Sequence, residues 1–264
     1  MSKTIKDIAA LKQAGEKIAM LTAYDSSFSY AADQAGVDVL LVGDSLGMVV
    51  QGQNTTLPVS VNDMVYHARA VRRGAPDAYI VVDMPYLSVS TPERALKNAG
   101  KIIQRAYANM VKIEGGDSVL SSIKALVENN VPVCGHLGLQ PQSVELAGGY
   151  QVQGREHSQA EKIMREAQAL EAAGVQMLVL ECVPADLARA ISLQLSIPVI
   201  GIGAGVDCDG QVLVCYDMLG LTAGKRPRFS HDFLQESASN QEAIALYVSR
   251  VKQAEFPSEQ HSFK

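Results

Sequence analysis

The chain has 264 residues, of which 47% are hydrophobic and 19% are charged, and its formal net charge is −5. This length is typical of one (β/α)8 barrel and is sufficient to bury a single large core. The acidic balance, the lack of a basic stripe and the absence of tryptophan argue against a nucleic-acid-binding protein.

The sequence also indicates the cellular compartment of the protein. Residues 1–7 lack the apolar centre of a signal peptide. No apolar run approaches the roughly 18 residues that a membrane span requires. The four cysteines form no CxxC pair and are predicted to be buried thiols in a reducing compartment. We therefore expect a cytoplasmic protein with no membrane partner.

Residues 1–16 predict a leading helix beneath the sheet, and eight apolar runs that follow predict strands. The strands are expected at 18–24, 38–42, 78–83, 109–114, 131–136, 176–181, 198–202 and 212–215. Most are separated by helical patterns, and the chain after the last strand is predicted to be helical to about Lys252. This order predicts an α/β protein, a single (β/α)8 barrel domain over residues 1–264. A doubly wound open sheet is the alternative.

Capping signals place several of the helix starts. Ser60 with Asp63 and Ser158 with Glu161 resemble capping boxes, and Asp117 is expected to cap a third helix. Three more helices have such signals. Ser26 begins one that Gly36 ends, Thr91 caps a second with Pro92 at its first position, and Pro184 begins a third. Long loops are predicted at 45–59 and at 137–157, the second containing Gly148 and Gly149. A structureless segment of that length in a compact domain is usually functional.

A polar side chain follows or ends five of the predicted strands. These residues are Asp44, Asp83, Glu114, His136 and Glu181. In parallel α/β folds the carboxyl ends of the strands form the ligand site. An aspartate just after a strand is often only a helix N-cap, which remains an alternative for Asp44 and Asp83. Glu114 and Glu181 fit that role less well.

Asp44, Asp83 and Glu114 would converge at neighbouring strand ends, where unpaired carboxylates repel each other and raise each other's pKa values. A hard divalent cation such as Mg²⁺ would relieve this repulsion. No His or Cys set has the spacing of a zinc site.

Lys112 precedes Glu114 by two residues, so both side chains point to the same face of their strand. Lys112 could hold a substrate carboxylate or enolate oxygen, or it could be paired with Glu114 alone. His136 could be a core histidine or could hydrogen-bond substrate. The glycines between Gly201 and Gly205 favour a tight turn over a phosphate site, because no nucleotide-binding fingerprint is present.

Five motifs carry a further signal. They are Val42-Gly43-Asp44-Ser45-Leu46-Gly47, Asp83 with Pro85, Met110-Val111-Lys112-Ile113-Glu114-Gly115-Gly116, Gly135-His136-Leu137-Gly138 and Leu180-Glu181-Cys182. Together they resemble the ketopantoate hydroxymethyltransferase family of pantothenate biosynthesis. More matches lie at 22–25, 56–59, 71–76, 198–205 and 261–263, so the resemblance covers essentially the whole chain.

The resemblance implies a barrel of the phosphoenolpyruvate/pyruvate type. It implies transfer of a one-carbon unit from 5,10-methylenetetrahydrofolate to 3-methyl-2-oxobutanoate through a Mg²⁺-stabilised enolate, giving 2-dehydropantoate. It also implies a homo-oligomer, a decamer of five dimers.

By the same resemblance, Asp44, Asp83 and Glu114 surround Mg²⁺, Glu114 directly or through water, and Glu181 is the catalytic base. Ser45 and Lys112 contact the keto acid, and we expect Asp44, Asp83 and His136 to line its site as well. A metal-dependent 2-oxo acid lyase or aldolase on the same barrel is the rival enzyme. A non-catalytic keto-acid-binding protein is the rival from another class.

Overall fold

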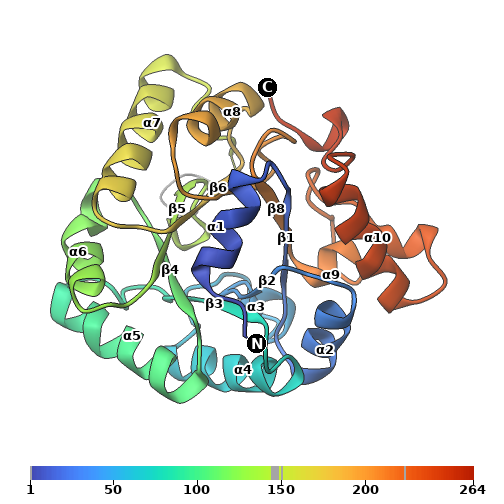
Figure 1. The fold of residues 1–264 in the computed structure, drawn as a ribbon, viewed down its shortest axis with the longest axis horizontal. Helices are drawn as coiled ribbons and strands as arrows, with labels where there is room; N and C mark the ends of the chain where they lie inside the picture. Colours follow the sequence, from blue (N-terminus) through green and yellow to red (C-terminus); the bar gives the residue numbers. More distant parts are fainter. Residues whose placement is uncertain (1, 144–148, 150, 223) are drawn as a thin grey trace.

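The computed structural model describes residues 2–143, 149, 151–222 and 224–264. Within them, eight parallel strands close into a barrel in sequence order, each strand pairing with the next and β8 with β1 (Figure 1). The strands are β1 (Ile18–Thr22), β2 (Val39–Val42), β3 (Tyr79–Asp83), β4 (Met110–Glu114), β5 (Val133–Gly138), β6 (Met177–Glu181), β7 (Val199–Ile202) and β8 (Gly210–Leu213). The predicted (β/α)8 barrel is confirmed, and the open sheet is wrong.

Helices surround the barrel, except α1, which lies across one end of it (Figure 1). They are α1 (Ile5–Gln13), α2 (Ser26–Gln34), α3 (Leu46–Val49), α4 (Val61–Gly74), α5 (Pro92–Ala106), α6 (Leu120–Glu128), α7 (His157–Ala172), α8 (Ala185–Gln194), α9 (Cys215–Met218) and α10 (Asn240–Lys252). Short 3₁₀ turns are η1 (Asp117–Val119), η2 (Pro141–Ser143), η3 (Phe233–Glu236) and η4 (Glu259–His261).

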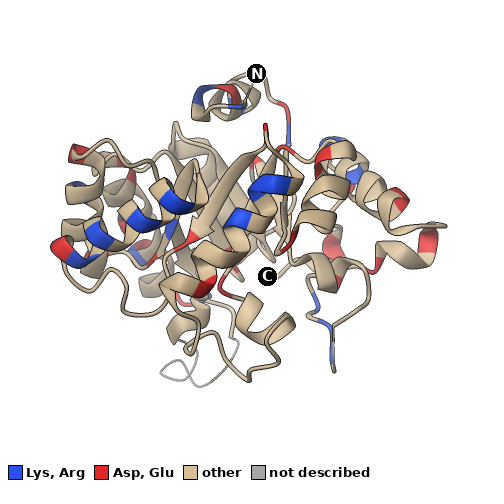
Figure 2. Ribbon diagram, turned by 90° about the horizontal axis from the view of Figure 1, so that it is seen from below, with Lys and Arg blue, Asp and Glu red and all other residues tan. Residues whose placement is uncertain are grey.

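The apolar side chains form two layers. One layer lies between the barrel and the helices around it. The other fills the inside of the barrel, where alternate strand residues such as Val39, Val81 and Met177 meet Ile8 of α1. Successive strand residues point to opposite faces, which is why every second residue contributes to the inner layer. Helix α1 therefore closes the amino-terminal end of the barrel and is not part of the outer ring of helices (Figure 2).

Four of the expected helix starts are confirmed, since α2 begins at Ser26 and α8 directly after Pro184, and the other two carry the predicted caps. Ser60 and Asp63 form the capping box of α4, with the Asp63 N–H donating to the Ser60 hydroxyl and the Asp63 carboxylate accepting from the Ser60 N–H. Thr91 caps α5 by accepting from the Arg94 N–H, and Pro92 occupies the first helical position. In both cases a side-chain oxygen satisfies an N–H that has no partner within the helix.

Two other caps are wrong. Asp117 lies in the turn η1, so α6 begins only at Leu120 and receives no side-chain cap. The backbone N–H of Asp117 instead donates to Glu166, a contact from a distant helix. Helix α7 begins before Ser158, with Glu156 at its N-cap position and no side-chain bond there.

The long loops and the last third of the chain also differ from expectation. The loop 45–59 contains α3, and the loop 137–157 contains η2, while Gly148 lies outside the described residues. Strand β8 lies two residues earlier than predicted, and Cys215 begins α9 instead of ending the strand. The chain is not continuously helical after β8, because irregular structure and η3 separate α9 from α10.

The glycine-rich turn after β7 leads directly into β8, with no helix between them. Gly203 and Gly205 have φ values of +61° and +83°, a region that residues with a Cβ rarely adopt. A Cβ on Gly205 would also lie 2.6 Å from the Cβ of Ala185. The preference for a tight turn over a phosphate site is consistent with this close packing.

The four cysteines are unpaired and buried, as expected. Burial raises the pKa of Cys134, Cys208 and Cys215 to about 12 in each case, so these are unreactive thiols. Across the described ranges, no helix combines the length and the hydropathy needed to span a bilayer.

Candidate active site

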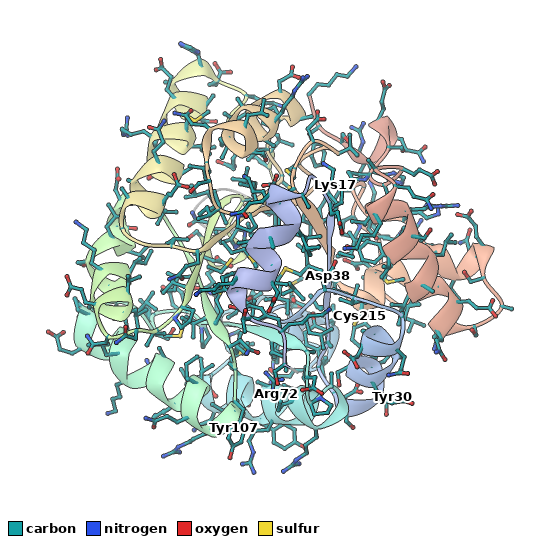
Figure 3. The ribbon with its side chains drawn as sticks, in the orientation of Figure 1. Lys17, Tyr30, Asp38, Arg72, Tyr107 and Cys215 are labelled. Atoms are coloured by element: carbon teal, nitrogen blue, oxygen red, sulfur yellow. The ribbon has the colours of Figure 1, made fainter. Side chains whose placement is uncertain are left out.

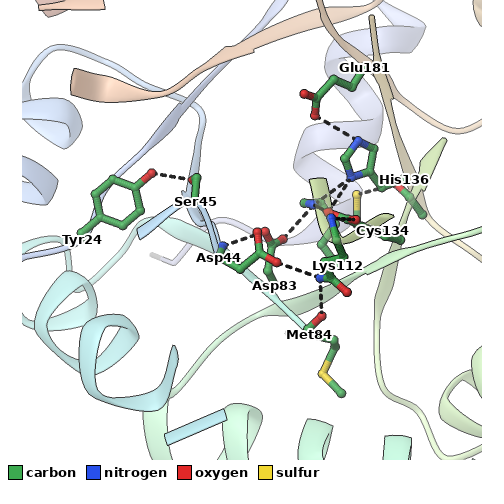
Figure 4. A network of polar contacts seen from close by, with 12 residues as sticks. Tyr24, Asp44, Ser45, Asp83, Met84, Lys112, Cys134, His136 and Glu181 are labelled. Carbon is green, nitrogen blue, oxygen red and sulfur yellow. Dashed lines mark hydrogen bonds and ion pairs between the residues drawn. The ribbon is translucent and has the colours of Figure 1, made fainter. Parts of the chain in front are cut away.

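A cavity of about 620 Å³ opens at the carboxyl ends of the strands, at the end of the barrel opposite α1. Its wall includes all seven residues that the sequence proposed for the site. These are Asp44, Ser45, Asp83, Lys112, Glu114, His136 and Glu181. The strand ends thus bring residues from five segments of the chain into one place, as Figure 4 shows.

The register of the strands explains much of this convergence. Asp83 of β3 pairs in register with Lys112 of β4, and Glu114 of β4 pairs with His136 of β5. All four residues occupy inward-facing positions, continuing the alternation that places Val81 and Met110 inside the barrel. The polar groups therefore form one layer directly above the apolar interior.

Lys112 is buried among carboxylates. Its Nζ lies 3.0 Å from Asp83 Oδ1 and 3.9 Å from Glu114 Oε1. Burial lowers the pKa of Lys112, but the charges of Asp83 and Glu114 outweigh that effect and raise the pKa above its ordinary value. The expected alternative of a lysine paired with Glu114 alone is wrong, because Asp83 is the closer partner. The ammonium also faces the cavity, where a substrate anion could reach it.

His136 lies between Glu181 and the group formed by Lys112, Asp83 and Glu114. Its Nδ1 lies 3.1 Å from Lys112 Nζ and 3.4 Å from Glu114 Oε1, and its Nε2 lies 3.2 Å from Glu181 Oε2. Burial and the charge of Lys112 lower the pKa of His136, while hydrogen bonds to Glu114 and Glu181 raise it, and the net direction is upward. His136 is thus buried and also lines the cavity, so its two expected roles are not exclusive.

Asp44 and Ser45 follow β2 on the other side of the cavity. The backbone N–H of Asp44 donates to Asp83 Oδ2 at 3.0 Å, which joins the ends of β2 and β3. The Ser45 hydroxyl lies 2.8 Å from the hydroxyl of Tyr24 (Figure 4). Asp44 is buried and does not cap the short helix α3, so the simple N-cap reading of this residue is wrong.

Gln142 is a site residue that sequence reasoning missed. Its side-chain amide donates to Asp44 Oδ2 at 2.8 Å, and its backbone N–H donates to Glu114 Oε2 at 3.2 Å. It lies in η2, within the loop 137–157 that was expected to be functional because of its length. That length was the only signal, since a glutamine in a loop carries no chemistry of its own in the sequence.

The three carboxylates differ in their acidity. Burial raises the pKa of Asp44 well above its usual range, and the charges of Asp83 and Glu114 raise it further. Burial also raises the pKa of Asp83, although Lys112 opposes the shift. For Glu114, His136 and Lys112 outweigh burial and lower the pKa. The expected mutual repulsion therefore holds for the two aspartates but not for Glu114, which already has cationic neighbours.

Comparison with known proteins identifies the family. Residues 2–259 match the sequence profile described as ketopantoate hydroxymethyltransferase. A protein of Alteromonas mediterranea named 3-methyl-2-oxobutanoate hydroxymethyltransferase is 54% identical over 261 residues, covering 99% of this chain and 98% of its own. The chain belongs to the ketopantoate hydroxymethyltransferase family. It is therefore an enzyme, a hydroxymethyltransferase.

Solved structures agree with the fold. A 2,3-dimethylmalate lyase, described as a member of the PEP mutase/isocitrate lyase superfamily, has a TM-score of 0.59 at 16% identity, covering 83% of this hydroxymethyltransferase and 81% of the lyase. A phosphonopyruvate hydrolase solved with oxalate and Mg²⁺ has a TM-score of 0.62 at 12% identity, covering 81% of each chain. At these identities the likeness shows the fold alone, which is the predicted (β/α)8 barrel.

The donor set of this hydroxymethyltransferase fits a hard cation. Asp83 Oδ1 and Glu114 Oε1 are buried carboxylate oxygens, and the groups nearest to them are Lys112 Nζ at 3.0 Å and His136 Nδ1 at 3.4 Å. Mg²⁺ favours such carboxylate oxygens. Across the described part of the chain, however, no three Asp, Glu, His or Cys side chains are already arranged around a common ion position. Lys112 and the Gln142 amide lie among the carboxylates, so binding a cation requires these donors to move aside or share their oxygens.

The backbone beneath Glu181 is closely packed. Gly138 at the end of β5 has a φ of +90°, and a Cβ there would lie 2.1 Å from the backbone oxygen of Glu181 and 2.8 Å from Val183 Cγ1. Cys182, the next residue after Glu181, has a φ of +48°, which is strained for a residue with a Cβ. The position of the Glu181 carboxylate is therefore set by a backbone that cannot shift freely.

If Glu181 is the catalytic base that the family resemblance implies, Gly138→Ala should lower kcat by about 10²-fold, because displacing a catalytic group by about 1 Å has an effect of that size. Gly100→Ala on α5 is the matched control, since a Cβ there meets nothing within 4 Å and alanine favours the helix. Steady-state kinetics and thermal melting of both variants provide the measurement. Wild-type kcat in Gly138→Ala would show that the close contact with Glu181 does not position the site.

Proposed function

We propose that this enzyme transfers a hydroxymethyl unit from 5,10-methylenetetrahydrofolate to 3-methyl-2-oxobutanoate, giving 2-dehydropantoate. The observation that carries the proposal is the separation within one cavity of an anion-rich cluster on β2–β4 from Glu181 on β6. The names of relatives such as the Alteromonas protein support the acceptor and the transferred group.

Glu181 is the proposed base. Its side chain is 13% exposed, compared with 5% for Glu114, so it reaches further into the cavity than the carboxylates of the cluster. It would take the proton from C3 of the keto acid. The C3 carbon would then bond to the methylene carbon, whose two bonds to folate nitrogens both break, and water would supply the hydroxyl oxygen. The C3 proton and one proton of the water would pass to the two nitrogens. His136, in contact with the Glu181 carboxylate, would hold it in position and share the proton.

The keto acid would lie between Ser45 and Lys112. A 2-oxo acid carries a carboxylate and a neighbouring carbonyl oxygen, which suit a buried ammonium and a hydroxyl donor. Lys112 Nζ and Ser45 Oγ both line the cavity, from opposite sides of the Asp83 carboxylate. The apolar wall formed by residues such as Leu41, Val179 and Ile202 would accommodate the methyl groups.

Asp44, Asp83 and Glu114 are the residues that would hold Mg²⁺. Bound there, the ion would act as a Lewis acid that stabilises negative charge developing on the keto oxygen. Glu114 is the carboxylate most engaged with other side chains, through Lys112, His136 and the Gln142 N–H. Contact between Glu114 and the ion through a water molecule would fit that crowding.

The test is an assay of the full chain with 3-methyl-2-oxobutanoate and methylenetetrahydrofolate, with and without EDTA. We expect product only with the folate present, and loss of product on chelation that Mg²⁺ reverses. Turnover of the keto acid without folate would favour the lyase or aldolase alternative. Binding of the keto acid without any turnover would refute the proposed reaction. The non-catalytic binding protein is already excluded by the family to which the chain belongs.

Lys112→Met retains most of the apolar stem and removes the charge. We expect the KM for the keto acid to rise at least tenfold, because a charge-assisted contact contributes about 1.5–3 kcal/mol. We also expect a lower melting temperature without metal, since Asp83 loses its buried partner, a change that costs about 3–5 kcal/mol in comparable pairs.

Lys97→Met, at an exposed position of α5, is the control for that substitution. Mg²⁺ should restore more stability to Lys112→Met than to the wild type, since the ion replaces the missing positive charge. A variant that is destabilised but binds the keto acid normally would make Lys112 a structural partner of Asp83 only.

A homo-oligomer is also part of the proposal, and exposed aromatic residues support it. Tyr30, Tyr66 and Tyr107 are 58%, 73% and 68% exposed and belong to α2, α4 and the end of α5, which pack side by side. Figure 3 shows Tyr30 and Tyr107 at the outer edge of this group of helices. Light scattering of the purified chain would measure the assembly, for which the family resemblance implies a decamer.

A further inference from the structure

A second cavity, of about 340 Å³, adjoins the active-site cavity. Its wall is formed by the segment 226–231, apart from Phe229, and by Gln260 and His261. Arg226, Pro227 and Arg228 line both cavities. This short stretch of chain therefore forms a wall of both cavities, and a long ligand that passes over it would reach both.

The charge of the entrance is opposite to that of the cluster on β2–β4. Lys225, Arg226 and Arg228, here called the cationic strip, all line the larger cavity. Arg226 pairs with Asp232 at 3.2 Å, whereas Lys225 and Arg228 pair with no carboxylate of the described chain. Two cations at the mouth of an enzyme cavity are thus available to an anionic group of a ligand.

The orientation of Arg228 is fixed by neighbours that leave its charge unpaired. Its Nε donates to the backbone oxygen of Gln260 at 3.1 Å, and its guanidinium lies 5.5 Å from the ring centroid of Phe263. Such contacts hold the group in place without neutralising it. Phe263 and Phe229 also line the larger cavity, so aromatic surface lies between the cationic strip and the interior of the barrel.

Ser230 provides an independent sign of a ligand. Its side chain is only 4% exposed and lines the second cavity, yet its Oγ has no hydrogen-bond partner among the described residues. A buried hydroxyl without a partner costs about 1–3 kcal/mol, so such groups usually meet a ligand or water. An oxygen atom of an anion held by the cationic strip would satisfy it.

The cavity sizes indicate which reactant extends this far. A pocket of 620 Å³ is in the range of drug-sized ligands, and a five-carbon keto acid fills only a part of it. The remaining space must accept the second reactant, whose one-carbon unit has to reach the keto acid. On the proposed function that reactant is a folate, a long molecule with an aromatic centre and a glutamate carrying two carboxylates at its far end.

We propose that the cationic strip and Ser230 bind the glutamyl carboxylates of the folate donor, and that a poly-γ-glutamyl chain continues into the second cavity. This inference rests on the proposed function. It makes the enzyme selective for polyglutamylated donors, because each further glutamate adds a carboxylate within reach of the strip.

The test compares 5,10-methylenetetrahydrofolate bearing one glutamate with the form bearing five, using the full-length enzyme and saturating keto acid. We expect the wild-type KM to be about tenfold lower for the pentaglutamate, the effect of about 1.4 kcal/mol of additional binding. Calorimetric titration with the two tetrahydrofolate forms, without keto acid, should show the same preference in Kd.

Two variants test the residues. Arg228→Gln should raise the pentaglutamate KM about tenfold, and Ser230→Ala about three- to tenfold, as expected for a charged and a neutral hydrogen bond. Ser230→Ala should also leave the melting temperature unchanged, because the hydroxyl has no partner to lose. Arg94→Gln, which makes the same charge change at an exposed position of α5, should leave both KM values unchanged.

Equal KM and Kd values for the two donors in the wild type would overturn the inference. A preference that survives in Arg228→Gln and Ser230→Ala would overturn it as well. If inorganic phosphate binds and both variants abolish that binding, while glutamate number has no effect, the pair of cavities is a phosphate site instead. Absence of product from either folate in the wild type would refute the proposed function itself.

Discussion

Glu181→Gln is expected to lower turnover by about 10²–10⁴-fold, the usual contribution of a positioned general base. Glutamine has the same shape but cannot accept the C3 proton at neutral pH. The contact with His136 Nε2 at 3.2 Å can persist through the amide oxygen, so the site should keep its geometry. Binding of keto acid and Mg²⁺ should therefore be nearly unchanged, which is the result expected when only a transition-state interaction is lost.

Proton exchange tests this assignment without the folate. Wild type with Mg²⁺ in D₂O should exchange the C3 proton of 3-methyl-2-oxobutanoate for deuterium, and Glu181→Gln should not. Glu161→Gln, at an exposed position of α7, is the matched control and should exchange normally. Exchange at the wild-type rate in Glu181→Gln would assign the base to another group, with His136 the nearest candidate.

Asp44→Ala and Asp83→Ala should each lower activity by about 10²-fold or more and abolish its response to Mg²⁺, because a bound metal supplies several kcal/mol of charge stabilisation. Mg²⁺ titrations of activity and of heat release on binding are the measurements. Full activity with an unchanged Mg²⁺ response in either variant would rule out the metal site.

The two variants differ in what they do to the fold. Asp83→Ala removes the partner of Lys112 and the acceptor for the Asp44 N–H, so it should lower the melting temperature. Asp44→Ala should not, because burial and the neighbouring carboxylates make the charge of Asp44 costly at neutral pH. Asp44→Ala is therefore the sharper test, since loss of Mg²⁺ binding in a stable protein cannot be attributed to unfolding.

The positions of the site residues followed largely from strand periodicity. The two-residue spacing of Lys112 and Glu114 correctly placed both on one face of β4, and apolar runs ending in polar residues indicated the end of the barrel at which the cavity lies. Periodicity indicates which side chains of a strand share a face, but it does not indicate the register of that strand against the next. The pairing of Lys112 with Asp83 depends on that register, and it was not predictable from either strand alone.

Contacts made by loops and turns were the part that sequence reasoning missed. Gln142 reaches Asp44 only because η2 folds over the strand ends, and the sequence of a loop does not specify that path. The wrong caps have a related cause. Asp117 carries a good capping side chain, but a 3₁₀ turn and the packing of Glu166 from α7 determine where its backbone lies. Tertiary contacts there override a local preference.

Helix α1 and the apolar layer inside the barrel close one end of the central space, so the active-site cavity is closed at its inner end. On the proposed function, the keto acid would occupy the inner part beside Lys112, and the folate would lie across the mouth between Phe229 and the cationic strip. A folate bound there first would obstruct the route inward through this cavity. The proposed arrangement therefore predicts a compulsory order, in which keto acid enters first and the spent folate departs before the product.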